Sequence, residues 1–328
     1  MILETERLIL RPWTSGDAES LYKYASDDRV GPIAGWQPHK SVEESRQIIF
    51  DVLSAKETYA VVLKETNEPV GSIGLMIGEK SNLVLAENEG EIGYWIGVPY
   101  WGRGLIPEAV NEMIRHAFEE LSLDRLWCGY FDGNEKSKRC QEKCGFRYHH
   151  TNRDIYWALT DDIRTEHITC LDKRYARPLM RFELPKAIDL CREVFLQFEA
   201  PEYPPEGVKH FRESLDDEER IKAMKWYGAF ENGNLVGVLS VRAPQHIGDF
   251  FVETGYQGKG FGRMLFEEMK KDFEKQVFTV NSSPYAVRIY EHLGFTATDG
   301  EQTVNGRRFT PMIYNAEEKD GDADEKPT

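Results

Sequence analysis

The 328-residue sequence has no uninterrupted apolar run near the ~18 residues needed to cross a bilayer. Charge appears at Glu4, Glu6 and Arg7, too early for the apolar segment of a secretion signal. Cysteine is scarce, and five cysteines without regular spacing favour reduced thiols over a disulfide framework. These absences predict a cytoplasmic protein with no membrane partner.

Positive charge is also in deficit, since 41 Lys and Arg stand against 56 Asp and Glu, a formal net charge of −15. Residues 317–328 hold six acids and two lysines, so they carry −4 and leave −11 on the rest of the chain. Such a surface repels phosphates, so we expect no nucleic-acid partner. It either attracts cationic partners or only keeps the protein in solution. The composition of 317–328 predicts an acidic, disordered tail.

Hydrophobic residues make up 41% of the sequence and aromatic residues 12%, which is enough to form packed cores. The length of the chain predicts two domains. A pattern of elements occurs twice. Each half contains a predicted β-hairpin, over residues 59–75 and 227–241, the second with Asn232-Gly233 at its turn. Each hairpin is followed by a further strand, at 91–96 and 249–252, and then by a glycine-rich turn.

An amphipathic helix follows each turn, with apolar residues at helical spacing over 106–121 and 261–273. Next in both halves come a strand, at 125–130 and 277–280, an asparagine, a short helix and a Gly-Phe pair. This order predicts an α/β fold of two tandem domains, each a mostly antiparallel mixed sheet with helices on both faces.

The boundary between the two patterns is a segment rich in charge and proline, residues 172–178. We therefore expect a first domain over about 1–174 and a second over about 175–316. The tail described above completes the chain.

The glycine-rich turns, residues 101–106 and 257–262, have the features of a pyrophosphate site. Glycine lets the backbone approach a ligand closely and turn its N–H groups toward it. The following helix adds unpaired N–H groups and the positive end of its dipole. Arg103 and Lys259 add a point charge to each turn.

Other phosphate motifs fit these turns less well. A Walker loop ends in Gly-Lys-Ser/Thr, which neither turn contains. A dinucleotide fingerprint lies in the first βα turn of a domain, whereas three strands precede each turn here. A tight turn without a ligand would explain one copy, but two copies in matching contexts favour binding. A nucleotide-binding enzyme is the competing interpretation.

Residues 257–262 resemble, without a departure, the Gln/Arg-x-x-Gly-x-Gly/Ala acetyl-coenzyme A (acetyl-CoA) motif of the GNAT superfamily of N-acetyltransferases. Residues 281–295 resemble the motif that follows it in that family. The first half is similar to the branch that acetylates ribosomal-protein N-termini. The segments that carry this second resemblance are 4–11, 93–96, 100–104 with Glu108-Ala109, 134–137 and 145–146.

The resemblance implies up to one acetyl-CoA in each domain. The first half departs from the motif at Trp101, in place of Gln or Arg, and at Ile106, in place of Gly or Ala. Backbone contacts to the ligand would tolerate both departures. The residues implied to bind acetyl-CoA are Ile96, Val98, Trp101, Gly102, Arg103, Gly104, Leu105, Ile106, Asn134 and Ser137 in the first half, and Phe251, Val252, Gln257, Gly258, Lys259, Gly260, Phe261, Gly262, Asn281 and Tyr290 in the second.

Acetyl transfer to an amine requires a neutral amine, a donor for the oxyanion and a proton for the departing thiolate. In the second half the resemblance indicates Tyr290 as the acid, and a core aromatic residue is the alternative. Asp249 is a candidate base there, with His246 as the other nearby ionisable residue. Either side chain is also compatible with a surface position.

In the first half, Gln141 occupies the place of Tyr290 when residues are counted back from Gly-Phe. Ser137 is therefore the candidate acid, and a helix-capping role for Asn134 or Ser137 is the alternative. Glu91 lies on the strand before the glycine turn, where many GNAT enzymes place a carboxylate, and is the candidate base. A solvated glutamate at a strand edge is its alternative.

Two further groups of residues are candidates for a functional site. Residues 199–206 combine three glutamates with rigid prolines between two helical stretches, where this fold usually contacts the acceptor. Cys140, Cys144, His149 and His150 can be drawn as a zinc site, but the cysteines lie one helical turn apart and lack a second pair. We expect no metal.

We therefore expect an N-acetyltransferase that transfers acetyl from acetyl-CoA to a primary amine by direct attack in a ternary complex. The acceptor is a small-molecule amine or a protein N-terminus, and the fold does not choose between them. In the alternative, one half, the first being the better candidate, binds acyl-CoA without catalysis as a scaffold. The chain is either a monomer with an internal pseudo-dimer or a homodimer.

Overall fold

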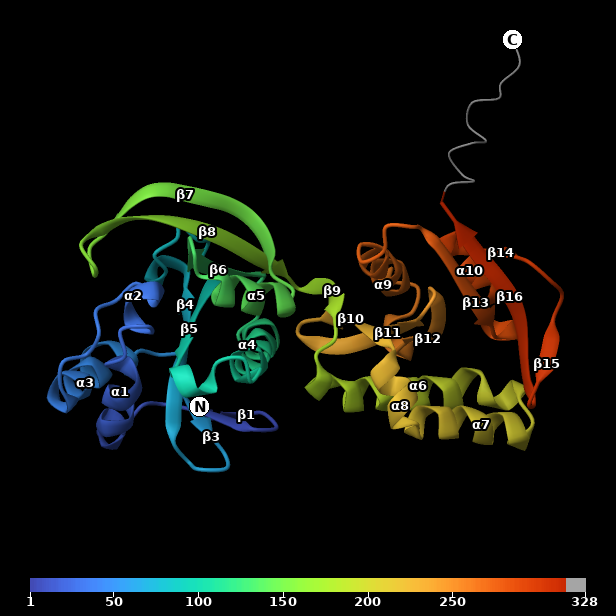
Figure 1. Ribbon diagram of the computed structural model, residues 1–328, viewed down its shortest axis with the longest axis horizontal. Helices are drawn as coiled ribbons and strands as arrows, with labels where there is room; N and C mark the ends of the chain where they lie inside the picture. The colour runs from blue at the N-terminus through green and yellow to red at the C-terminus, as the bar shows by residue number, and fades with distance from the viewer. Residues whose placement is uncertain (317–328) are drawn as a thin grey trace, which may run out of the picture. The chain divides into compact units, whose positions relative to one another are not determined.

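The computed structural model describes residues 1–316, and the chain folds as two compact units (Figure 1). The first unit is Met1–Lys173 and the second begins at Arg174. The predicted tail, 317–328, lies outside the described residues. No helix within residues 1–316 is both long and apolar enough to cross a bilayer.

The first unit is built on one eight-stranded sheet, in which only the β5–β6 pair is parallel. Its order is β1-β2-β3-β4-β5-β6-β8-β7, and α1 and α4 pack on opposite faces (Figure 1). The strands are β1 (Leu3–Glu4), β2 (Leu8–Arg11), β3 (Thr58–Leu63), β4 (Pro69–Ile77), β5 (Glu89–Ile96), β6 (Arg125–Phe131), β7 (Arg147–Trp157) and β8 (Asp162–Asp172). The helices are α1 (Ala18–Ala25), α2 (Gly31–Ala34), α3 (Val42–Ile48), α4 (Leu105–Arg115) and α5 (Glu135–Lys143).

The described residues of the second unit repeat this plan, with β12–β13 as the only parallel pair. The sheet order is β14-β16-β13-β12-β11-β10-β9, and β15 pairs with β16 beside it. The strands are β9 (Arg174–Pro178), β10 (Lys225–Glu231), β11 (Asn234–Arg242), β12 (His246–Val252), β13 (Val277–Ser282), β14 (Thr296–Ala297), β15 (Gln302–Val304) and β16 (Arg307–Asn315). The helices are α6 (Leu184–Phe198), α7 (Pro205–Asp216), α8 (Glu218–Ala223), α9 (Phe261–Lys270) and α10 (Val287–Leu293).

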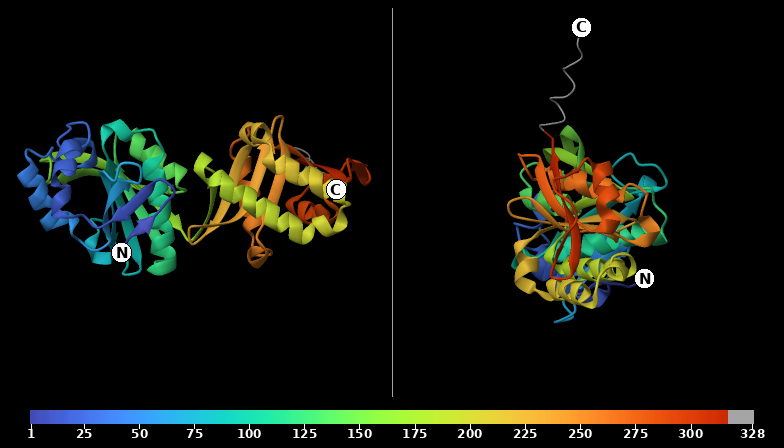
Figure 2. Two further views of the ribbon diagram at one scale, coloured as in Figure 1. Left: turned by 90° about the horizontal axis from the view of Figure 1, so that it is seen from below. Right: turned by 90° about the vertical axis from the view of Figure 1, so that its right-hand side faces the viewer.

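The period-2 pattern of the strands explains why helices cover both faces of the second sheet. Trp226 and Val238 pack into a core with α6 and α7, which run across one face of the strands (Figure 2). Their neighbours Tyr227 and Leu239 pack into a separate core with α9 on the other face. The predicted mixed sheet with helices on both faces, formed twice, is confirmed.

Both predicted hairpins are present, as the antiparallel pairs β3–β4 and β10–β11. Asn232 and Gly233 have φ of 54° and 83°, as a tight two-residue hairpin turn requires. The charged segment predicted between the domains lies almost entirely within two strands. The strand β8 ends at Asp172, and β9 begins at Arg174.

The parallel strands in the middle of each sheet stay paired over only a few residues. Glu89, Gly90 and Glu91 pair with β6, although β5 continues to Ile96. In the second unit only His246 and Ile247 pair with β13. Each sheet therefore opens between these strands, just before the glycine turn that follows β5 or β12.

A buried ion pair fixes the start of α6 to the second sheet. The Arg177 side chain, 2% exposed, donates to both Glu183 carboxylate oxygens at 2.8 and 2.7 Å, and lies over the Phe230 ring. Glu183 also accepts from the backbone N–H of Met180. This pair holds the helix whose far end reaches the cavity of the second unit.

Replacing Glu183 with Gln leaves the Arg177 charge buried without its carboxylate, and we expect a loss of about 3–5 kcal/mol in the free energy of unfolding. The matched control is Glu231→Gln, which breaks the exposed Arg174–Glu231 pair and should cost at most about 1 kcal/mol. Urea unfolding of the full chain measures both. Equal losses in the two variants would contradict the buried pair's role.

Candidate active site

The two glycine turns have the same backbone geometry. Each begins with a single 3₁₀ turn, Val98–Tyr100 or Thr254–Tyr256, and continues through one extended residue. Two left-handed glycines then flank the basic residue, and the helix starts at once. The φ angles are 75° and 73° at Gly102 and Gly104, and 72° and 91° at Gly258 and Gly260.

Space around these glycines is open on the side where a ligand would lie. A Cβ added at Gly102, Gly258 or Gly260 would meet no atom within 4 Å. Glycine is therefore required by the positive φ rather than by packing. Because α4 and α9 begin directly after the turns, their first N–H groups have no carbonyl partner within the helix. These features fit the predicted pyrophosphate site.

The residue that opens each turn makes the same hydrogen bond in both units. The indole N–H of Trp101 donates to the Ile96 carbonyl at 2.9 Å, and the side-chain amide of Gln257 donates to the Val252 carbonyl at 2.9 Å. Trp101 thus supplies the donor that Gln supplies in the motif. The departure at this position preserves the anchor between the turn and the end of the strand.

The basic residues of the turns are also placed alike. Arg103 lies over the ring of Tyr100, and Lys259 lies over the ring of Tyr256, each at 5.3 Å. In the first unit the guanidinium of Arg7 donates to the Arg103 carbonyl and pairs with the buried Glu108. This contact joins two of the segments that carry the resemblance, residues 4–11 and Glu108.

Other residues predicted to bind the cofactor lie at or beside the ends of β5 and β12 and at the starts of α4 and α9. Ile96 and Phe251 are buried at the ends of β5 and β12, and Val98 and Val252 are half-buried beside them. Leu105 and Phe261 begin the helices with buried side chains. Ile106 is buried, whereas a Cβ at Gly262 would lie 3.3 Å from the Phe250 ring.

Asn134 and Asn281, which the sequence pattern matched, differ in position. Asn134 caps α5 by accepting from the Ser137 N–H at 3.2 Å, as the capping alternative predicted. Asn281 is not a cap, because β13 continues to Ser282 and Asn281 pairs with Pro311 of β16. The prediction that β13 ends at residue 280 was wrong here, since pairing to β16 extends the strand.

In the first unit, Glu91 is not a solvated strand-edge residue. It is 7% exposed and accepts from the Ser81 hydroxyl at 2.6 Å. Burial raises the pKa of the Glu91 carboxyl above its usual value, so this group holds a proton more tightly than a surface glutamate.

Ser137 belongs to a hydroxyl network on the other face of β5. Its Oγ lies 3.1 Å from the Tyr94 hydroxyl and accepts from Gln141 Nε2 at 3.2 Å. Gln141 also donates to the Gly129 carbonyl, so it is a buried structural residue. Since Glu91 and Tyr94 are three positions apart on one strand, their side chains point to opposite faces. The structure does not bring Glu91 and Ser137 together on one face.

Sequence reasoning missed Glu166, on β8. Its carboxylate lies over Gly129 of β6, where a Cβ would come within 2.6 Å of it. Burial, together with the charge of Glu91, raises the pKa of Glu166 to about 7. The sequence carries no signal of this position, because the contact with Gly129 depends on how β6 and β8 pair.

In the second unit, Asp249 is tied into the protein. It is 2% exposed, and both carboxylate oxygens accept from Arg220, at 3.0 and 2.8 Å. The Ser240 hydroxyl donates to it at 2.6 Å. The other candidate, His246, bonds Thr279, and burial lowers its pKa to about 4, so it is neutral at pH 7.

Tyr290 is a core aromatic residue, as the alternative interpretation predicted. Its ring packs against Phe250 and Phe295 in the α9 core, and the residue is 5% exposed. It also lines a cavity of about 400 Å³. Burial raises the pKa of the Tyr290 phenol, so the hydroxyl keeps its proton at neutral pH.

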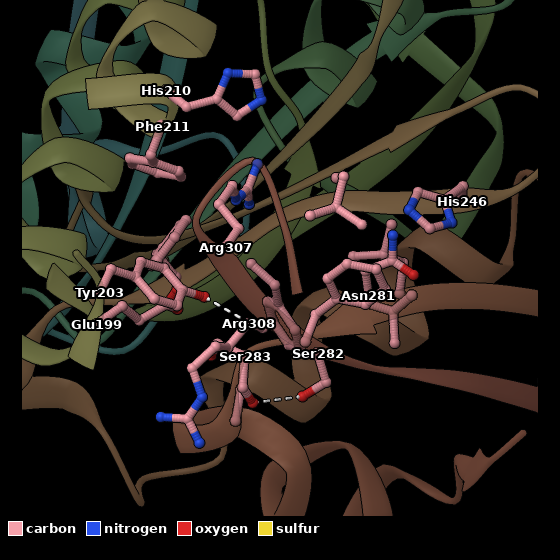
Figure 3. Close-up of a pocket in the computed structure, with 18 of the residues that line it drawn as sticks. Glu199, Tyr203, His210, Phe211, His246, Asn281, Ser282, Ser283, Arg307 and Arg308 are labelled. Carbon is pink, nitrogen blue, oxygen red and sulfur yellow. Dashed lines mark hydrogen bonds between the residues drawn. The ribbon is translucent and has the colours of Figure 1, made fainter. Parts of the chain in front are cut away.

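This cavity lies at the opening between β12 and β13. Figure 3 shows Glu199, Tyr203 and Arg307 gathered on one side, with His246 and Asn281 on the other. Besides these strands, its walls come from the end of α6, from α7 and from the β15–β16 hairpin.

Two contacts fix the β15–β16 hairpin over the cavity. Gly306, at the hairpin turn, touches Gly207 of α7 so closely that a Cβ on Gly207 would lie 2.4 Å from the Gly306 carbonyl oxygen. The Tyr203 hydroxyl donates to the Arg308 carbonyl at 3.2 Å. The segment 199–206 therefore both lines the cavity and positions its cover.

Glu199 is the carboxylate of that segment in the cavity wall. It follows the last residue of α6 and is half-buried. Burial raises the pKa of Glu199 to about 7, while the charge of Arg307 opposes the rise. A carboxylate with this pKa accepts a proton readily at neutral pH. Glu202, by contrast, is exposed.

Cys140, Cys144, His149 and His150 do not form a metal site. Within residues 1–316, no three His, Cys, Asp or Glu side chains are grouped as ligands of one ion. His149 and His150 instead contact each other through their Nδ1 atoms.

The anchor of the first turn is tested by two substitutions of Trp101. Gln keeps an N–H donor near the Ile96 carbonyl, whereas Phe removes it, and a neutral hydrogen bond contributes about 0.5–1.5 kcal/mol. We expect W101F to speed amide hydrogen exchange over residues 101–105 about five- to tenfold. W101Q should leave exchange close to that of the native protein. The same acceleration in both variants would show that the indole ring, not its N–H, holds the turn.

Both halves of the chain are similar to known acetyltransferase domains. A family profile described as Acetyltransferase (GNAT) domain matches residues 7–147, and a second profile of the same description matches residues 199–316. The uncharacterized N-acetyltransferase YoaA of Bacillus subtilis is 32% identical over 151 residues, 44% of this chain and 82% of that protein.

Two further proteins show the same likeness. The uncharacterized N-acetyltransferase p20 of Bacillus licheniformis is 29% identical over 180 residues, 53% of this chain and 98% of that protein. A solved acetyltransferase of the GNAT family from Bacillus anthracis is 23% identical, with a TM-score of 0.47, over 52% of this chain and 98% of that one.

Proposed function

The chain belongs to the GNAT family of acetyltransferases, and from this we propose that it transfers the acetyl group of acetyl-CoA to a primary amine in a ternary complex. Each unit carries one donor site, at its glycine turn. The acceptor is a small-molecule amine or a protein N-terminus.

The observation that carries this proposal is the repeated geometry of the two turns. The same left-handed glycines, the same hydrogen bond to the end of the strand and the same cation over a tyrosine occur in both units. Side chains differ at four positions of the turns, Trp101, Arg103, Leu105 and Ile106, while the left-handed glycines recur at the same two positions. Conserved backbone geometry with altered side chains supports ligand binding through N–H groups.

At the donor sites the N–H groups of residues 102–106 and 258–262 would bind the pyrophosphate. Arg103 and Lys259 would add positive charge beside it. The ends of β5 and β12 that are not paired with β6 and β13 would lie along the rest of the ligand, at Ile96 and Val252. Acetyl-CoA supplies the activated thioester.

In the second unit, Glu199 acts as general base and Tyr290 as general acid. The amine nitrogen bonds to the acetyl carbon as the carbon–sulfur bond breaks, Glu199 takes one amine proton and Tyr290 gives a proton to the thiolate. The products are an amide and a free thiol. Both residues line the same cavity, the pKa of Glu199 suits a general base, and the Tyr290 phenol carries its proton at neutral pH. Asp249 holds Arg220 and Ser240 in place rather than moving protons.

In the first unit, Glu91 acts as base and Ser137, with its partner Tyr94, as acid, on the two faces of β5. The second possibility is that this unit binds acyl-CoA without transferring it. Gln141 in the place of Tyr290 supports that alternative.

Donor binding is tested at each turn separately. Valine at Gly104 or Gly260 cannot adopt the left-handed φ without strain and blocks the open face. Isothermal titration of the full chain should show two coenzyme A sites in the native protein, one in each single variant and none in the double variant. Gly255→Val, at a glycine with open space and ordinary φ, is the control and should keep both sites.

Binding of NAD or ATP in place of coenzyme A would overturn the donor assignment. If G260V alone abolishes free-thiol release while G104V has no effect, the first unit is a binding module.

The role of Glu199 is tested by the pH dependence of acetyl transfer. Its pKa is raised to about 7, so the basic form accumulates above that pH, and kcat/KM should show a rising limb with its midpoint near pH 7. Glu199→Gln should remove this limb and lower kcat about 10²–10⁴-fold. The measurement is free-thiol release with acetyl-CoA and a reactive amine, in the Gly104→Val background.

The control is Glu202→Gln, since Glu202 lies in the same segment but is exposed. It should leave the pH profile in place. A profile in which E199Q retains the limb near pH 7 would assign the base elsewhere.

A further inference from the structure

The cavity of the second unit is lined by more positive than negative side chains, although the chain as a whole is acidic. Four arginines reach it. Arg220 is paired with Asp249, and Arg308 is paired with Glu301. Among the described residues, no ion pair or side-chain hydrogen bond engages Arg307 or Arg242.

Of the two, Arg307 is the stronger candidate for binding a ligand, because it is half-buried while Arg242 is exposed. It is the first residue of β16, and its guanidinium lies 5.7 Å from the centre of the Phe211 ring. The contacts of Gly306 with Gly207 and of Tyr203 with Arg308 hold this part of the hairpin in place. A guanidinium that is partly desolvated, fixed and without a carboxylate partner is suited to binding an anion.

Glu199 lies near enough for the Arg307 charge to affect it, yet no ion pair joins them. Figure 3 shows the two on the same side of the cavity. The cavity thus offers an acceptor for an ammonium proton and a donor for an anion close to each other. Three of its residues, Phe211, Phe251 and Phe309, form an aromatic wall, and polar residues such as Asn281 and Ser282 line the rest together with other apolar ones.

We propose that the acceptor of the second unit is an amine that also carries a carboxylate, an amino acid with an apolar side chain. Its amine lies toward Glu199, its carboxylate binds Arg307, with Arg242 adding charge nearby, and its side chain lies against the aromatic wall. The proposal rests on the acetyl-transfer function proposed above and names its substrate class.

The first unit has the opposite charge at the corresponding place. Glu91 lies on β5, the strand beside its opening, Glu166 lies on β8, and burial together with the charge of Glu91 raises the pKa of Glu166. Recognition of an anion is therefore a property of the second unit, and the test isolates it with the Gly104→Val background.

The test compares matched acceptors on the full chain carrying Gly104→Val. L-Phenylalanine, L-leucine and L-methionine are each paired with their amides, which keep the amine and side chain but lose the carboxylate. The amine of an amide loses its proton more readily, so intrinsic reactivity favours the amide. We expect the acids to have at least tenfold higher kcat/KM by free-thiol release. The aminophosphonate analogue of phenylalanine shows whether the anion must be a carboxylate or any tetrahedral anion is accepted.

Arg307→Gln should lower kcat/KM for the acids about 10–100-fold, as expected for loss of a charge-assisted bidentate contact, and leave the amides nearly unchanged. Arg308→Gln is the matched control, since that guanidinium is already paired with Glu301, and should affect acids and amides alike and little. Equal turnover of acids and amides in the native sequence would overturn the proposal. So would an equal fall for both classes in R307Q, which would indicate a structural role.

Binding of the same compounds to the coenzyme A-saturated chain, measured calorimetrically, separates the two proposals. Acids that bind through Arg307 without thiol release would support the anion site and refute acetyl transfer. Amides that react while acids neither bind nor react would refute the anion site and support acetyl transfer. If no member of the panel binds or reacts, an amino-acid acceptor is wrong.

Discussion

The rest of each unit depends on one constraint, namely that the two central parallel strands are paired over only part of their length. β5 and β12 leave their partners after Glu91 and Ile247 and run on for several residues before the glycine turn. This places the start of a helix beside backbone that the neighbouring strand does not pair. In the second unit the same opening forms the floor of the cavity, lined by Phe250 and Asn281. One departure from regular pairing thus sets both sides of the site.

The two units keep one side of this arrangement and differ on the other. At the turns, an indole replaces an amide and arginine replaces lysine, yet each bond and each ring contact is retained. Beyond the strand opening, the first unit places two glutamates and a serine–tyrosine network. The second places a glutamate, a tyrosine and two arginines that have no ion pair within residues 1–316. The donor side uses backbone groups, which tolerate side-chain exchange, whereas selection of an acceptor depends on the side chains themselves.

Local charge at the cavity also differs from the charge of the whole chain. A net charge of −15 suggested cationic partners, but Arg307 and Arg242 face the cavity without a carboxylate partner among the described residues. Glu199 and Arg307 come from segments about a hundred residues apart and meet only because the hairpin turn at Gly306 packs on Gly207. Net charge describes a surface on average, and a cavity only a few side chains wide is free to differ from it.

The sequence by itself determined the repeated order of elements, the hairpin at Asn232-Gly233 and the place of both glycine turns, because these depend on local periodicity and on residues with special φ angles. It also singled out Glu91, Tyr290 and residues 199–206. Only the tertiary structure decided that Trp101 donates a hydrogen bond to the end of β5 and that Asp249 is paired with Arg220. It also decided that Asn281 lies within β13 and does not cap a helix. It alone brought Glu199, Tyr290 and Arg307 to one cavity. These facts depend on burial and on contacts between distant segments, and no short-range pattern encodes either.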